Sequence, residues 1–126
     1  MSKGKDFSGV ISRLRALKEA SDVDNQKSGF EAGQKWAEND ADLNEFRRLE
    51  KASDSESYRS GWSELFEGEN SAVALHAVIV GYSSAAEALE FFESYGASQE
   101  EMQDGTYIRG FAEGALEIWK AVKDEL

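Results

Sequence analysis

The residue of this sequence best suited to acid–base chemistry is His76, its single histidine. A histidine that acts as a general base is usually oriented by a carboxylate or paired with a nucleophile. His76 instead lies within the most apolar run of the chain, residues 72–80. None of the four residues one helical turn away is ionisable; they are Ala72, Val73, Ile79 and Val80. We therefore expect His76 to be a structural residue and not a catalytic one.

The sequence lacks the residue patterns that are typical of metal-binding and phosphate-binding sites. The absence of cysteine rules out a thiolate zinc site and a cysteine nucleophile. Val73 stands three residues before His76, where a di-metal carboxylate bundle would carry a glutamate. The acids around Asp22 and Asp24 do not follow the calcium-loop pattern, and no glycine-rich phosphate loop occurs. The sequence predicts no catalytic residue, no metal and no cofactor.

One enzymatic alternative rests on the number of carboxylates, 25 in all. Two acids far apart in the sequence could converge in the fold, as in glycoside hydrolysis. The chain would then be a small hydrolase or sugar-acting enzyme. A deep pocket with two or more converging acids would favour this function, whereas a convex surface with a continuous acidic stripe would favour a binding protein.

Charge is distributed unevenly along the 126 residues. Fourteen Lys and Arg stand against 25 Asp and Glu, a net charge of −11, yet residues 1–20 hold five bases and two acids. Between Arg59 and Arg109 there are nine acids and no Lys or Arg. Such a stretch gives part of the surface a negative field. The candidate partner-binding residues in it are Glu64, Glu67, Glu87, Glu90, Glu93, Glu100, Glu101 and Asp104.

Two interpretations of these acids stay open. They could form a solvated face and complement helix dipoles, as Glu100, Glu101 and Asp104 would at a helix start. They could instead form a surface that attracts a basic protein and repels the phosphates of nucleic acids. The leading functional expectation is a non-catalytic interaction protein that binds a protein partner. In its sharper version the partner is a basic nucleic-acid-binding protein whose DNA or RNA site the chain occupies, without binding nucleic acid itself.

No membrane partner is expected from the sequence. The longest apolar run, residues 72–80, is too short to cross a bilayer core of roughly 30 Å as a helix. Residues 7–17 mix apolar with charged side chains, so no signal-peptide core follows the lysines near the start. We therefore expect the protein in the cytoplasm.

A short glycine motif occurs twice, as Gly29-Phe-Glu-Ala-Gly33 and Gly110-Phe-Ala-Glu-Gly114. Glycine inside a helix costs roughly 1 kcal/mol relative to alanine, so these positions need a reason. Close approach of two helix backbones within the chain is one such reason. The alternative is that the same four glycines form a self-association face, which would make the protein a homodimer.

Apolar periodicity predicts a single all-α domain, residues 1–126, of five or six helices with a long C-terminal helix. The first helix covers residues 7–17, where Phe7, Val10, Ile11, Leu14 and Leu17 share one face. The pattern is lost over residues 20–25, which predicts a connection. A second helix carries Phe30, Gly33 and Trp36 and ends near Asn39. A third follows, capped by Asp40 or Asp42, with Leu43, Phe46 and Leu49 on its apolar face.

Further along, Ser53 and Glu56 have capping-box spacing, ahead of an apolar face of Tyr58, Trp62, Leu65 and Phe66. Residues 72–80 fit a helix that continues through Ala85, Leu89 and Phe92 better than a strand, because no second strand-like run is present to pair with them. An α+β fold with a short strand near 72–80 is the alternative. Ser98 and Glu101 have the capping-box spacing at the start of the C-terminal helix. The aromatic residues expected in the core are Trp36, Trp62, Phe111 and Trp119.

Overall fold

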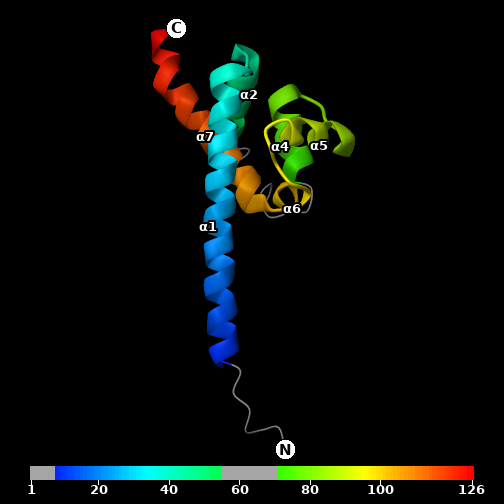
Figure 1. Cartoon of the computed structure of the whole chain (residues 1–126). Coiled ribbons are helices and arrows are strands. Elements are labelled where there is room, and N and C mark those ends of the chain that lie inside the picture. The colour runs from blue at the N-terminus through cyan, green and yellow to red at the C-terminus, as the bar shows by residue number, and fades with distance from the viewer. Residues whose placement is uncertain (1–7, 55–70) are drawn as a thin grey trace, which may run out of the picture.

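The structure, a computed structural model, describes residues 8–54 and 71–126 (Figure 1). Within them lie six α-helices, a 3₁₀ turn (Lys123–Glu125) and no strand. The helices are α1 (Ser8–Asn39), α2 (Leu43–Asp54), α4 (Ser71–Val80), α5 (Ala85–Glu93), α6 (Gln99–Met102) and α7 (Gly105–Val122). The all-α prediction is confirmed, and residues 72–80 belong to a helix.

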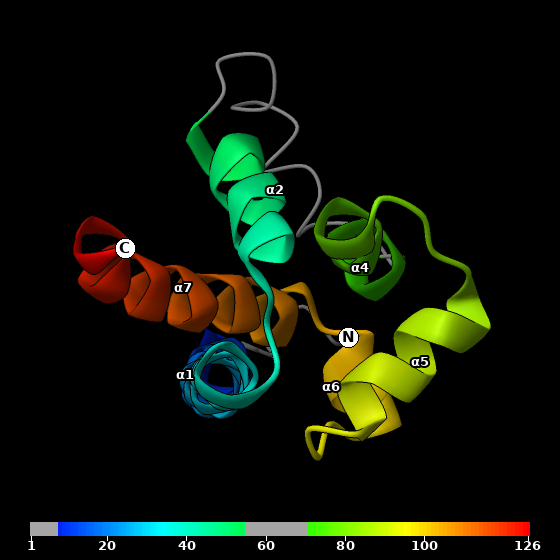
Figure 2. The same ribbon diagram turned by 90° about the horizontal axis from the view of Figure 1, so that it is seen from above.

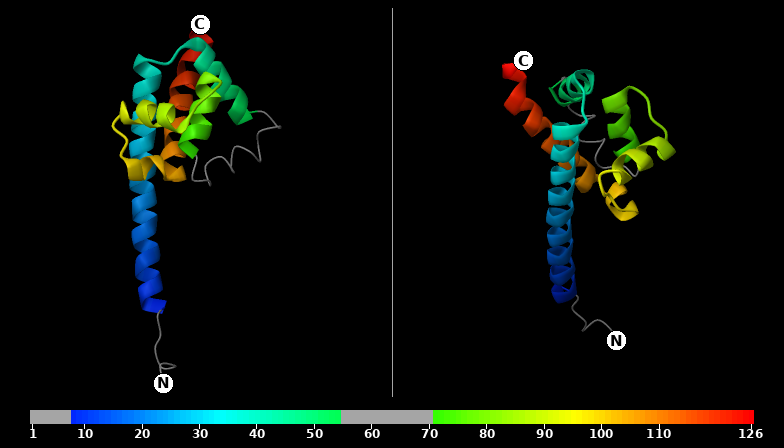
Figure 3. Two further views of the ribbon diagram at one scale, coloured as in Figure 1. Left: turned by 90° about the vertical axis from the view of Figure 1, so that its right-hand side faces the viewer. Right: turned by 45° about the horizontal axis from the view of Figure 1, so that its top comes forward.

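The longest element is α1, a rod of 32 residues. Its C-terminal part packs against the other helices, whereas its N-terminal part projects beyond them (Figures 1 and 3). The predicted connection at residues 20–25 is wrong, because α1 runs through them without a break. The less exposed residues of this stretch are polar, and Asn25 donates a hydrogen bond to Asp104. A Lys18–Asp22 ion pair of 3.1 Å, one helical turn apart, also supports the helix.

Helix α7 crosses α1 and lies between α1 and α2 when the molecule is viewed from above (Figure 2). The crossing is closest at the two glycine motifs. A Cβ on Gly29 would overlap the carbonyl oxygen of Tyr107, and a Cβ on Gly114 would overlap that of Phe30. The absence of side chains at these positions lets the two backbones touch.

The core is an aromatic cluster built by several helices. Trp36 of α1 lies with its ring centroid 5.8 Å from Phe46 of α2 and 5.8 Å from Phe111 of α7. Phe92 of α5 meets Phe111 edge to face at 5.0 Å. Edge-to-face and tilted pairs of this kind are the favoured geometries for aromatic rings. Trp36, Phe111 and Trp119 are all buried, as predicted.

Polar side chains at the rim of the core join the C-terminal end of α7 to α2. Glu50 accepts hydrogen bonds from Trp119 Nε1 and Lys123 Nζ, each at 2.8 Å. The bond from Lys123 is the main reason why the pKa of Glu50 lies below its ordinary value. Arg48 donates to the carbonyl oxygen of Ile79 at 2.7 Å and so holds the last turn of α4 against α2.

Two helix starts follow the sequence predictions. The backbone N–H of Glu45 donates to Asp42 Oδ1, and Glu45 accepts in return from the backbone N–H of Asp42, which settles the cap of α2 on Asp42. Ser98 and Glu101 form the predicted capping box at the start of α6. Both pairs satisfy backbone donors that a helix start leaves unpaired.

Two predicted continuous helices are in fact interrupted. The helix from residue 72 ends at Val80, because Gly81 adopts φ +89°, and α5 starts anew after the N-cap Ser84. The predicted C-terminal helix from Ser98 divides into α6 and α7 at Asp104. The side chain of Asp104 accepts a hydrogen bond from the backbone N–H of Thr106. Short polar side chains can replace a helical backbone hydrogen bond in this way and so interrupt a helix.

Ser53, predicted to begin a helix, lies in the last turn of α2, where its hydroxyl donates to the carbonyl oxygen of Glu50 at 2.9 Å. Glu56 and the predicted apolar face with Trp62 lie outside the described residues.

Candidate interaction surfaces

Four of the acids singled out by the sequence form what we call the acidic face: Glu87, Glu90, Glu93 and Glu100. By helical spacing, the first three lie on the side of α5 opposite its buried residues Ala88 and Phe92, and Glu100 lies on α6. Helix α6 follows α5 after a turn (Figure 2). All four are exposed. The salt bridges of the described residues use other acids, namely Asp22, Glu50 and Glu113.

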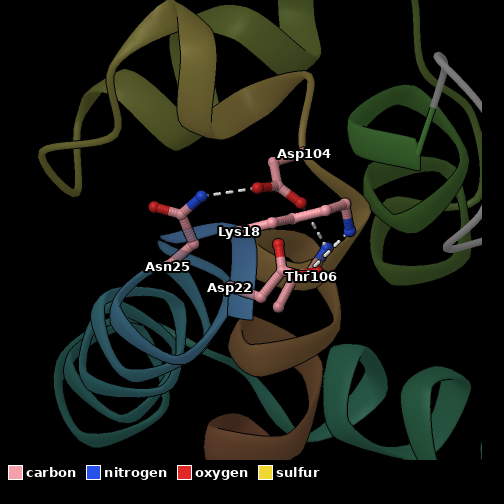
Figure 4. A network of polar contacts seen from close by, with 5 residues as sticks. All are labelled: Lys18, Asp22, Asn25, Asp104 and Thr106. Carbon is pink, nitrogen blue, oxygen red and sulfur yellow. Dashed lines mark hydrogen bonds and ion pairs between the residues drawn. The ribbon is translucent and has the colours of Figure 1, made fainter. Parts of the chain in front are cut away.

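Within the acidic face, Glu87 accepts a hydrogen bond from Ser84 Oγ at 3.2 Å. Two further candidate acids also have structural partners. Glu101 accepts from the backbone N–H of Ser98 at 3.0 Å. Asp104 caps α7 through Thr106 and also accepts from Asn25 Nδ2, which ties the turn between α6 and α7 to α1 (Figure 4). Glu101 therefore holds the start of α6. Asp104 holds α1 at the point where it leaves the body, by which we mean α2, the helices α4 to α7 and the C-terminal part of α1. Glu64 and Glu67 lie outside the described residues.

His76 is buried between α4 and α5. Its ring lies 4.7 Å from that of Phe91, and its Nδ1 lies 2.6 Å from Ser83 Oγ. Since this hydroxyl donates to the carbonyl oxygen of Ser84, the contact is satisfied when His76 carries its proton on Nδ1. Burial lowers the pKa of His76, and the nearby charge of Glu87 only partly opposes this.

The contact between His76 and Ser83 has the length expected of a base and a nucleophile. However, neither residue lines any of four open grooves that the described residues form. The pair ties α4 to the turn before α5.

The lowered pKa predicts a pH dependence of stability. As pH falls through the ordinary histidine pKa of about 6.5, the unfolded chain takes up a proton that the folded chain resists, so the unfolding free energy falls. We expect the melting temperature to drop between about pH 7.5 and pH 5.5 by more in the wild type than in His76→Gln, because glutamine does not titrate. Equal drops in the two proteins would contradict a depressed pKa.

Four open grooves of about 330–420 Å³ lie on the described part of the surface, and none of these four is a deep pocket with free converging acids. The groove between α1 and the turn at Gly96 contains two carboxylates, Glu31 and Glu101. Glu101 is held by its capping box, and Lys35 lies in the same groove. Within the described part of the chain no group of three or more metal-type ligands exists. The groove beside Phe30 also contains two carboxylates, Glu113 and Glu117, and Lys120 lies in it as well. The enzymatic alternative stays a prediction.

The projecting part of α1 is a surface whose exposure the sequence did not predict. Every residue from 8 to 21, which we call the α1 arm, is exposed. Four of its side chains form an apolar stripe and are 43–60% exposed: Val10, Ile11, Leu14 and Leu17. The spacing of apolar residues predicted this helix face. The one sequence signal of its exposure was the loss of the apolar pattern over residues 20–25, just after it.

Comparison with protein-family models, with curated proteins and with solved structures gives no match for this chain. Among the described residues, no single helix is both long and apolar enough to cross a membrane; α4 and α5 would pass that test of length and composition only as a pair, and they are bent by 86°.

Proposed function

We propose that the protein is a non-catalytic interaction protein that binds a basic protein partner through the acidic face. The observation that carries this proposal is the exposure of Glu87, Glu90, Glu93 and Glu100 without a Lys or Arg anywhere in residues 71–108. Exposed charges without counter-charges create the field that steers a partner of opposite sign. The proposal keeps the cytoplasm as the expected compartment.

A partner that itself binds nucleic acid would suit this surface. The binding site of such a partner accommodates a row of negatively charged phosphates. Helix α5 presents a comparable row, since every third residue from Glu87 to Glu93 is a glutamate. The acidic face would then occupy the site that DNA or RNA uses, and an oligonucleotide would compete with the protein for it.

The test is affinity capture from the host lysate at low and high salt, followed by kinetics with the partner obtained. Neutralising Glu87, Glu90 and Glu93 together to Gln should slow association by about tenfold or more, since electrostatic steering commonly contributes 10-fold to 1,000-fold. The fold should be unchanged, because exposed charges contribute little to stability.

The matched control neutralises three exposed acids on other surfaces, Glu31, Glu38 and Glu117, and so has the same net charge. If both triple variants slow association equally, net charge is responsible and the acidic face is not the site. Capture that is insensitive both to salt and to the acidic-face variant would remove the proposal.

A further inference from the structure

We propose that the α1 arm is a dimerisation element that pairs antiparallel with the arm of a second copy of the chain. This inference goes beyond the proposed function, because it concerns a different surface. It starts from the apolar stripe of Val10, Ile11, Leu14 and Leu17, which the described helices leave uncovered.

The first argument is the direction in which the stripe faces. Residues about 18 apart lie at the same angle on an α-helix, since 18 residues make about five turns. Ile11 therefore faces the same way as Gly29, and Leu14 the same way as Ala32, which pack into the body. Val10 and Leu17 align instead with Ser28 and Lys35, which are exposed at the edge of that packed side. The stripe therefore overlaps the packed side of α1, and it lies on the part of the helix that projects past the body. Figure 3 shows this projecting part.

The second argument is length. A partner that lies along the stripe meets the body near Asp22, the first residue of α1 that is not fully exposed. The free length is that of residues 8–21, about 20 Å at about 1.5 Å per residue. A single helix about 20 Å long fits along this part of α1. The arm of a second copy has the same length, because it is the same segment of the same sequence.

The third argument is register. Val10, Leu14, Leu17 and Ser21 alternate at spacings of four and three, the seam of a two-stranded coiled coil. In the antiparallel arrangement Leu14 meets Leu17 of the second copy, and each Val10 meets Ser21 of the other. The same register brings the start of each arm to the partner's body. There Asp22 and Asp24 lie near the positive end of the incoming helix dipole.

Charge favours the antiparallel orientation. Residues 8–18 carry Arg13, Arg15 and Lys18 and no acid. In a parallel pair Arg13 would lie across from Lys18 of the other arm, whereas in the antiparallel pair it lies beside Ala20 and Lys18 lies beside Ile11. The antiparallel pair also places the two bodies at opposite ends, which separates chains that each carry a net charge of −11.

Sedimentation velocity of the full chain tests the pairing. The contact is small beside stable dimer interfaces of about 1,200–2,000 Å², so concentrations should span roughly 10 µM to 1 mM. We expect a concentration-dependent dimer. Leu14→Gln together with Leu17→Gln should raise the dissociation constant at least about tenfold, while the melting temperature of the dilute monomer stays the same.

The matched control is Val23→Gln. Val23 is 63% exposed on the same helix but lies outside the stripe, so its replacement should leave dimerisation unchanged. A wild-type chain that remains monomeric throughout, or a dimer that the Leu14 and Leu17 changes do not weaken, would overturn the proposal. Neither outcome tests the proposed binding through the acidic face, because that proposal is tested with different variants, at Glu87, Glu90 and Glu93.

Cross-linking tests the orientation, because the chain has no native cysteine. Leu14→Cys and Leu17→Cys are prepared separately, one of them with an affinity tag, and are then mixed and oxidised. The antiparallel register predicts a disulfide mainly between Cys variants at different positions. Predominant linkage between like positions would indicate a parallel pair and would overturn the proposed arrangement.

Discussion

Replacing Gly33 with alanine should destabilise the protein by about 1–3 kcal/mol or more, the usual cost of inserting a methyl group into a well-packed site. Helix propensity alone predicts the opposite, a gain of about 1 kcal/mol. The new Cβ would overlap the carbonyl oxygen of Phe111 and lie 2.8 Å from its carbonyl carbon. These are backbone atoms inside α7, which cannot rotate away, so α1 and α7 would have to separate.

The control is Gly9→Ala in the α1 arm. A Cβ on Gly9 has no neighbour within 4 Å, so this variant should be neutral or slightly more stable. Chemical denaturation of both variants gives the comparison. A Gly33→Ala protein as stable as Gly9→Ala would show that the two backbones do not touch. Gly114→Ala should behave as Gly33→Ala does, since its Cβ would overlap the carbonyl oxygen of Phe30.

Truncating Trp36 to alanine should cost about 3–5 kcal/mol, the range measured for large aromatic residues in cores. Trp36 joins three elements, because its ring contacts Phe46 of α2, Phe91 of α5 and Phe111 of α7 at centroid distances of 5.8–5.9 Å. The side chain is buried, and a cavity there would touch all three. Since a domain is typically stable by only about 5–15 kcal/mol, the variant should be at the edge of folding.

Tyr82→Ala is the aromatic control, because Tyr82 is 72% exposed and should change stability by less than about 0.5 kcal/mol. Melting followed by far-UV circular dichroism measures both variants. A Trp36→Ala protein that melts with the wild type would place Trp36 outside the core.

Local patterns predicted the ends of several helices because the signals there involve residues three or four apart. The pair Ser98 and Glu101 is one example, and Asp42 with Glu45 is another. The breaks at Gly81 and Asp104 were missed because each residue is compatible with a helix in sequence. At Gly81 the chain turns sharply from α4 into α5. Beside Asp104, α7 docks on α1, and this contact with Asn25 is a tertiary one.

Candidate sites were harder to predict than helices. The base-free interval was plain in the sequence, but only the structure distinguishes its exposed acids, such as Glu90, from acids that hold the fold, such as Asp104. That distinction depends on Asn25, which lies 79 residues away in sequence from Asp104. No local pattern contains such a contact.

By itself the sequence determined the helical class, the apolar faces and the signs of charge, because these follow from residue type and from spacings of three and four. The tertiary structure decided which apolar faces are covered. Phe111 and Leu14 both stand on apolar helix faces, yet Phe111 is buried at the crossing of α1 with α7 and Leu14 is 52% exposed on the arm. The difference arises because burial depends on whether another helix reaches the same place. The glycine contact between α1 and α7 determines where another helix covers α1. The part of α1 that extends beyond this crossing stays uncovered.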